Sequence, residues 1–231
     1  QNAITNLRPY ANKLTELLQI LSATLNGEDG SVYATKRKVE KVLLVAITSN
    51  RGLCGAFNSN IIKKSQALIK ENYPDKEVSI FTIGKKGNDS LGKKENIYSN
   101  NNDVFDNLSF TKTAVIAQLM MDAYADQKFD QIILVYNRFK NAATQIPTFE
   151  QFLPIESTSS EKTTNTDYIF EPSKKRIIEE LIPKSLKMQL FKAIRDSYAS
   201  EHGARMTAMH KAVSYTHLRA HETPEHLVCR L

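Results

Sequence analysis

The residues with the clearest chemical potential lie in a glycine-containing segment, residues 51–58, which reads RGLCGAFN. It follows an apolar run and precedes a helix-spaced one, and α/β proteins that bind nucleotides place their phosphate loop at such a junction. The segment lacks the Gly-Lys-Ser/Thr ending of a P-loop and the three glycines of a dinucleotide fingerprint. We therefore predict a structural strand-to-helix turn, whose members are Arg51, Gly52, Cys54 and Gly55. The sequence IGKKG at residues 83–87 is a weaker candidate of the same kind.

Cys54 is a possible nucleophile because it stands where a helix is expected to begin. A nucleophile also needs a base within reach, and the first histidine of the chain is His202. The acidic residues around the expected strands form no close pair of carboxylates, and no group of residues has the spacing of metal ligands. We therefore expect a small buried cysteine, no catalytic residue, no cofactor and no metal.

The last 19 residues, 213–231, differ from the rest of the chain. They contain three of the five histidines and the second cysteine, at His217, His221, His226 and Cys229. This spacing fits no usual zinc site. The segment also loses the helical spacing of apolar residues, and it resembles a translated sequencing adapter. We interpret it as a non-native tail.

The composition is that of a protein with a hydrophobic core. The chain has 231 residues, of which 41% are apolar and 24% charged, so it is too apolar for a disordered tail protein. Two cysteines are too few for a scaffold built on disulfides, and no stretch approaches the roughly 20 apolar residues of a membrane helix. The formal charge of +6 comes from small scattered groups of basic residues without interleaved aromatics. We favour a solvated basic surface over a nucleic-acid site.

Strand-like and helix-like segments alternate after about residue 39. Continuous β-favouring runs cover residues 42–47, 78–83 and 132–136, and helix-spaced apolar residues cover 58–70 and 111–126. This alternation is typical of an α/β unit with a mostly parallel sheet. Residues 144–153 are predicted to add an antiparallel strand, and the Ser/Thr-rich run 156–166 to be a linker.

Both ends of the chain are predicted to form long helices. Apolar residues recur in steps of three and four from Ile4 to Leu25, which is the pattern of a coiled coil, and Pro9 within it should bend the helix. A second apolar stripe extends to Ala212, and Pro183 is predicted to open a new helix after a break. An apolar stripe needs a partner, so the two helices are expected to pair with each other.

Three motifs resemble the gamma subunit of the F-type ATP synthase. They are RGLCG at residues 51–55, YIFEP at 168–172 and SEHGARMTAM at 200–209, and RPYA at 8–11 and Ile182-Pro183 also fit. The resemblance covers residues 1–212. It implies an α/β fold in which a Rossmann-like, mostly parallel sheet head is inserted between two long terminal helices that form an antiparallel coiled coil. It also implies a non-catalytic subunit, the central rotor stalk, which transmits torque between the membrane c ring and the catalytic alpha-beta hexamer in proton-driven ATP synthesis.

The resemblance further implies roles for particular residues and partners. Tyr168 and Glu171 would lie at the foot of the stalk, and the shaft helices would include Leu14, Leu18, Leu21, Glu201, Arg205, Met206 and Met209. The implied partners are the alpha, beta and epsilon subunits and the membrane c ring, with no nucleic acid and no direct membrane insertion. Cys54 is the only cysteine before residue 213, so the regulatory cysteine pair of chloroplast members is absent. We therefore expect a protein peripheral on the cytoplasmic face of a bacterial inner membrane.

These expectations divide the chain into four parts. Residues 1–27 would be the N-terminal coiled-coil helix, truncated relative to the family, and 28–166 the α/β head domain. Residues 167–212 would be the C-terminal coiled-coil region and 213–231 the non-native tail. The alternatives are a small α/β nucleotide-binding enzyme, which would bind a nucleotide at residues 51–57, and a basic nucleic-acid-binding module, whose affinity would fall as salt rises.

Overall fold

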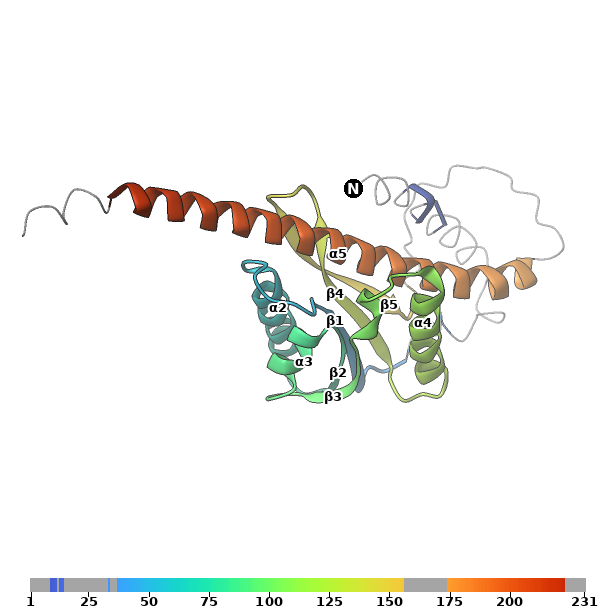
Figure 1. Ribbon diagram of the computed structural model, residues 1–231. Coiled ribbons are helices and arrows are strands. Elements are labelled where there is room, and N and C mark those ends of the chain that lie inside the picture. The colour runs from blue at the N-terminus through green and yellow to red at the C-terminus, as the bar shows by residue number, and fades with distance from the viewer. Residues whose placement is uncertain (1–8, 12, 15–32, 34–36, 156–173, 223–231) are drawn as a thin grey trace, which may run out of the picture.

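A five-stranded sheet forms the centre of the head, and a single long helix lies across one end of it (Figure 1). The computed structural model describes residues 9–11, 13–14, 33, 37–155 and 174–222. The strands are β1 (Lys41–Ile47), β2 (Glu77–Ile83), β3 (Asn96–Asn101), β4 (Gln131–Phe139) and β5 (Gln145–Leu153). The helices are α2 (Phe57–Asn72), α3 (Lys85–Leu91), α4 (Phe110–Ala125) and α5 (Lys174–Glu222), with a 3-10 turn at Asp103–Phe105.

The strand order is β3-β2-β1-β4-β5. The first four strands pair in parallel, and β5 pairs antiparallel to β4. The predicted mostly parallel sheet is therefore confirmed, including the antiparallel strand near residues 144–153. Strand β3 and helix α3 were not predicted, because β3 has the polar sequence NIYSNN and is held by its pairing with β2.

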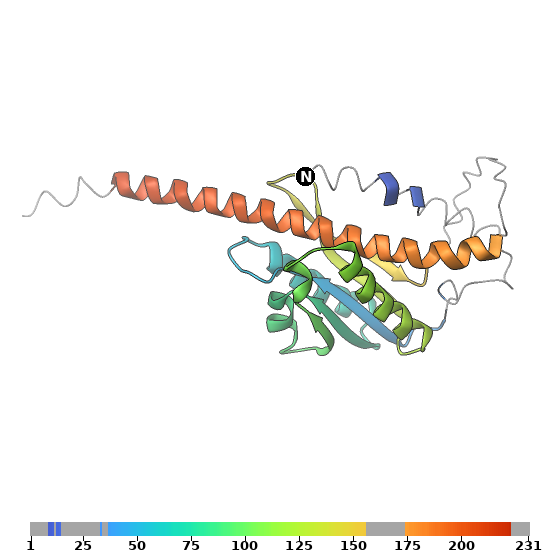
Figure 2. The same cartoon turned by 45° about the vertical axis from the view of Figure 1, so that its right-hand side comes forward.

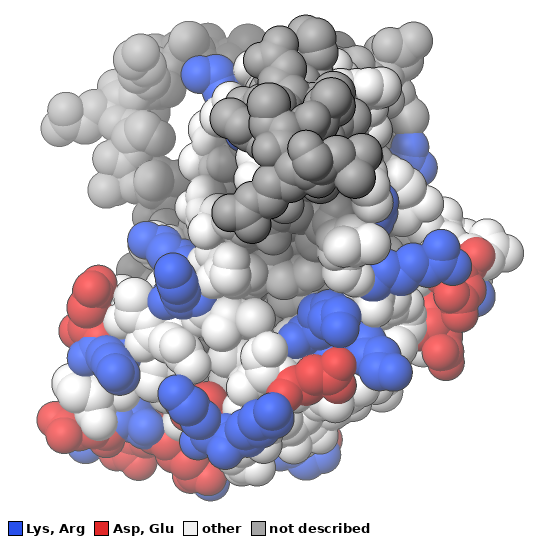
Figure 3. All heavy atoms as spheres, turned by 60° about the vertical axis from the view of Figure 1, so that its left-hand side comes forward, with Lys and Arg blue, Asp and Glu red and all other residues white. Residues whose placement is uncertain are grey.

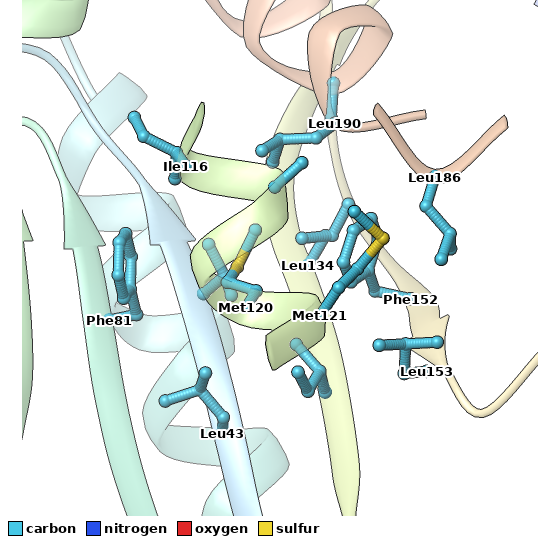
Figure 4. Packing of buried hydrophobic residues seen from close by; sticks show 14 of the residues in the cluster. Leu43, Phe81, Ile116, Met120, Met121, Leu134, Phe152, Leu153, Leu186 and Leu190 are labelled. Atoms are coloured by element: carbon cyan, nitrogen blue, oxygen red, sulfur yellow. The ribbon is translucent and has the colours of Figure 1, made fainter. Parts of the chain in front are cut away.

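Alternate residues of the buried strands point to two separate cores, as the strand period of two requires. In β1, Leu43, Val45 and Ile47 face a core shared with α4 and α5. Figure 4 shows the labelled members of this core, with Leu186 and Leu190 of α5 close to Phe152 of β5. The intervening residues of β1 face α2 and α3 with Ile61 and Leu68. Both faces of the sheet are thus covered, which explains the continuous apolar runs.

Helix α5 has 49 residues, which corresponds to a length of about 73 Å. Its middle lies over the head and its last turns project beyond it (Figure 2). The predicted break before Pro183 is wrong, because this proline lies inside the continuous helix. Ile182 and Leu186 on either side are 5% and 2% exposed against the core, and this packing offsets the hydrogen bond that the proline cannot make.

Two further observations concern the ends of the chain, and the first differs from the prediction. Helix α5 does not stop near residue 212 but continues to Glu222, with residues 211–217 exposed to solvent. At the other end, residues 9–11 and 13–14 are helical, and Ala11 and Leu14 are buried. The rest of the predicted N-terminal helix, its pairing with α5 and the linker at 156–166 lie outside the described residues.

Candidate functional site: the contact between the glycine turn and the long helix

The glycine turn, residues 51–57, is held in shape by side chains from its flanks. Asn58 Oδ1 accepts a hydrogen bond from Ser49 N at 3.0 Å, and Ser49 Oγ donates to Arg51 O at 2.6 Å. The Nδ2 of Asn58 also lies 3.2 Å from Cys54 Sγ. Cys54 is a free thiol and is 2% exposed, so its side chain packs inside the turn.

The turn reverses through left-handed backbone at Leu53 (φ 60°) and Gly55 (φ 57°). Glycine adopts this conformation without a steric penalty, which accounts for the residue at position 55. Leucine does so less easily, yet Leu53 is 76% exposed. The turn therefore presents one large apolar side chain to solvent.

The second glycine-containing segment does not leave donors free for a phosphate. The N–H groups of Lys85, Lys86 and Gly87 donate to Asn50 Oδ1, Ser49 O and Thr48 Oγ1, at 3.1, 3.1 and 2.9 Å. A phosphate site at a helix start needs such N–H groups unpaired. The segment at 83–87 is thus a closely packed junction between β1 and β2.

Helix α5 is fastened to the glycine turn by Arg205, whose side chain also forms an ion pair within the helix. Arg205 Nη2 lies 2.6 Å from Glu201 Oε1 and donates to Gly52 O at 3.4 Å. The Glu201 side chain is only 9% exposed and that of Arg205 24%, so the pair is shielded from water and stronger than a surface pair. Next to it, Ala204 packs against Cys54 and Phe57 of the turn.

The same region of α5 touches the hairpin between β4 and β5. Thr207 Oγ1 donates to Ala142 O at 3.2 Å. A Cβ added to Gly203 would lie 2.9 Å from Ala142 O and 3.1 Å from its Cα. A glycine inside a helix costs about 1 kcal/mol relative to alanine, and here it permits the helix and the hairpin backbone to approach closely.

A third attachment reaches β4 itself. Ser200 Oγ donates to Asn137 O at 3.0 Å, and Asn137 Nδ2 donates to Phe57 O at 3.1 Å. Ser200 and Asn137 are both 0% exposed. One buried asparagine therefore joins α5, β4 and the start of α2.

These attachments lie at the place where an open α/β sheet usually binds a ligand. The strand order reverses between β1 and β4, and such folds bind ligands in the crevice at the carboxyl ends of the strands there. In this structure the residues after β1 and in the second half of β4 contact α5 between Ser200 and Thr207. The geometry supports mechanical attachment of α5 at this position.

A further polar contact fixes α5 on the other side of β4. Tyr136 Oη donates to Glu150 Oε1 at 2.6 Å, and Lys192 Nζ lies 3.6 Å from the same oxygen. Burial, and then the nearby charge of Glu150, raise the pKa of the Tyr136 phenol well above its usual range. The phenol is thus neutral and a hydrogen-bond donor at any physiological pH.

The residues expected from the sequence fall into three groups. Glu201, Arg205 and the glycine turn come together, whereas Met206 and Met209 point to solvent with 61% and 43% exposure. Leu14 is buried. The other expected residues, Leu18, Leu21, Tyr168 and Glu171, lie outside the described residues.

Sequence reasoning missed Asn137, Ser200 and Ala142 as parts of this contact. Ser200 begins the SEHGARMTAM motif, and the glycine at position 203 inside a helix was the available signal of a close approach. Asn137 and Ala142 had no such signal. Within the described part of the chain, no group of three His, Cys, Asp or Glu side chains could hold a metal ion. No described helix combines the length and the hydropathy needed to cross a bilayer.

Comparisons with known proteins agree with this arrangement. The sequence model of the ATP synthase family matches residues 1–217. The chain is 60% identical over 212 residues to the ATP synthase gamma chain of Christiangramia forsetii and 60% over 213 residues to that of Flavobacterium johnsoniae. Each alignment covers 92% of this chain and 74% of the relative.

Solved structures with a similar fold are also ATP synthase rotors. The central stalk and c-ring structure of the Tetrahymena thermophila mitochondrial ATP synthase has a TM-score of 0.62 at 24% identity, covering 91% of this chain and 99% of that one. The Euglena gracilis mitochondrial rotor has a TM-score of 0.59 at 20% identity, covering 93% and 89%. The chain belongs to the family of ATP synthase gamma chains, which are central-stalk subunits of a membrane-associated complex and not its catalytic subunits.

Proposed function

We propose that this chain transmits torque through the contact between α5 and the head. The observation that carries the proposal is that α5 binds three separate head segments within two helical turns, at Gly52, Asn137 and Ala142. A helix held at one point could pivot about that point. A helix held at three points, of which Gly52 is far in the sequence from Asn137 and Ala142, turns together with the head.

The solvent-exposed side of α5, at and beyond its contacts with the head, is the part that would work inside the alpha-beta hexamer. Before residue 213 its exposed large apolar residues are Met206 and Met209, with 61% and 43% exposure. Exposed methionines are typical of contact surfaces. An asymmetric helix turning within a threefold ring would favour a different conformation at each catalytic site, so rotation would exchange their affinities.

The foot would contact the epsilon subunit and the c ring through the segment that includes Tyr168 and Glu171. This assignment rests on the resemblance of the YIFEP sequence to the family. The complex would lie on the cytoplasmic face of a bacterial inner membrane. We keep the division into a helix at 1–27, a head at 28–166, a helical region at 167–212 and a non-native tail at 213–231 as part of this proposal.

The surface charge of the head fits a protein partner better than a nucleic acid. On the face that carries α2 and α3, basic side chains are spread out and acidic ones lie among them (Figure 3). A nucleic-acid site would require a continuous basic stripe. The attachment of α5 beside the ends of β1 and β4, together with the paired N–H groups of α3, argues in the same way against a nucleotide-binding enzyme.

The proposal is tested by assembly. The chain is co-expressed with the alpha, beta and epsilon subunits of Christiangramia forsetii, and the complex is purified through a tag on beta. We expect the chain to co-purify with three alpha and three beta subunits and to bind added c ring only when epsilon and the chain are both present. Recovery of the hexamer without the chain would contradict the proposal.

A further inference from the structure

Helix α5 supplies a hydrogen-bond donor to a main-chain carbonyl group of β4 that is left unpaired by the neighbouring strands. In the β4–β5 ladder, Asn137 lies opposite Pro147. Proline has no N–H, so it cannot donate to the carbonyl group of Asn137. The parallel pairing of β4 with β1 ends before this position, at Val135. Asn137 O is therefore a buried acceptor that needs a partner from outside the sheet.

Ser200 supplies that partner. Its Oγ donates to Asn137 O at 3.0 Å, and the hydroxyl is fully buried. A buried carbonyl that loses its donor costs more than a typical hydrogen bond contributes, because the group is left without water as well. The long helix is thus bound into the hydrogen bonding of the sheet at this residue.

The side chain of Asn137 also forms a hydrogen bond to the glycine turn. Asn137 Nδ2 holds Phe57 O at 3.1 Å, and Phe57 N donates to Cys54 O at 3.2 Å. Phe57 in turn packs with Cys54 and Ala204, the latter on α5. Asn137 therefore accepts a hydrogen bond from Ser200 of α5 through its main chain and donates one to the glycine turn through its side chain. Helix α5 contacts the same turn again at Ala204.

We propose that Ser200 and Asn137 are positioning residues that fix the angle between α5 and the glycine turn, so that the head and the shaft rotate as one stiff body. The inference deepens the proposed function and rests on it for its role in torque. The two residues touch no substrate and act through the turn. Ser200 is the better one to test, because its hydroxyl can be removed with little change in volume.

The chain contains a matched control for this test. Ser197 lies on the same helix three residues earlier and is 1% exposed, but its Oγ has no hydrogen-bond partner. Ser197→Ala and Ser200→Ala therefore remove the same buried atom from the same helix. They differ in whether that atom holds β4.

The first measurement is amide hydrogen exchange of the isolated chain at residues 54–60. We expect Ser200→Ala to accelerate exchange of the Phe57 and Asn60 amides about tenfold, since a buried hydrogen bond is lost. We expect Ser197→Ala to leave these rates unchanged and Ser200→Thr, which keeps the hydroxyl, to restore them. Equal rates in the two alanine variants would overturn the inference whether or not the complex rotates.

The second measurement is the torsional stiffness of the assembled complex. A probe on the head is followed while the complex is paused, and the spread of its angle reports stiffness. We expect a broader distribution for Ser200→Ala than for Ser197→Ala, with recovery in Ser200→Thr. If all three variants match the unchanged chain, the inference fails while the proposed function stands. If the unchanged chain does not assemble, the proposed function fails and the exchange result alone decides the structural inference.

Discussion

Gly84 is a position at which the neighbouring backbone leaves no room for a side chain. Its φ is +109°, and a Cβ there would overlap Thr48 O and lie 2.7 Å from the Thr48 carbonyl carbon. We predict that Gly84→Ala lowers the free energy of unfolding by about 2–4 kcal/mol, through strain and displaced backbone. Urea denaturation measures this.

Gly52→Ala is the control for that measurement. A Cβ at Gly52 would meet only the flexible end of Lys86, at 4.0 Å. We expect a change below about 1 kcal/mol. Comparable losses in the two variants would show that glycine content, and not the approach to Thr48, limits the stability of the head.

The buried ion pair makes a second prediction. Glu201→Gln leaves the Arg205 guanidinium without its charged partner at a site where Glu201 is 9% exposed. We expect a loss of about 1–3 kcal/mol in the free energy of unfolding. Glu180→Gln, at an exposed pair 3.8 Å from Lys184, should change it by less than about 1 kcal/mol. If the two variants behaved alike, the charge of Glu201 beside Arg205 would be energetically unimportant.

The raised pKa of Tyr136 predicts that the free energy of unfolding decreases at alkaline pH. Its pKa in the folded chain is raised, first by burial and then by Glu150, above the usual value of about 10. The folded state therefore holds the phenol proton more tightly than the unfolded state does. The resulting contribution of Tyr136 to the free energy of unfolding is complete below about pH 10 and is lost as the pH rises beyond it. Stability curves from pH 8 to 11 should fall less steeply for Tyr136→Phe. An equal slope in both proteins would rule out Tyr136 as a cause.

At the scale of elements, the buried strands were predictable and the polar strand was not. The runs at 42–47, 78–83 and 132–136 are apolar throughout because helices cover both faces of the sheet. Strand β3 carries no such pattern, since only its pairing with β2 holds it. The continuity of α5 across Pro183 was also hidden, because the packing of neighbouring residues on the core cannot be seen from local propensity.

Pro183 allows this packing argument to be tested. If tertiary contacts hold the helix despite the proline, Pro183→Ala should restore a helical N–H and raise the free energy of unfolding by about 1–3 kcal/mol. Thermal unfolding followed by circular dichroism measures the gain. A decrease would mean that the proline ring itself contributes packing or direction to the helix.

At the scale of the whole molecule, the sequence predicted the head and the two helical ends but not how the head is held. The glycine turn and the SEHGARMTAM motif were visible as separate segments, 143 residues apart between their last and first members. Their contact is supported by Asn137 and Ala142, which carry no pattern of their own and accept hydrogen bonds from α5 through main-chain carbonyl groups. Such contacts are determined by the path of the backbone and not by residue type.

The attachment of α5 at three points leads to one claim about the molecule, namely that head and shaft turn together. The most direct measurement is rotation of a probe attached through Lys94→Cys, an exposed position on the head, in a chain carrying Cys229→Ser, with Cys54 protected by burial. In a complex immobilised through its beta subunits, we predict that ATP drives stepwise rotation of this probe in one direction. ATP hydrolysis by the same complexes with a stationary or freely diffusing probe would contradict the account.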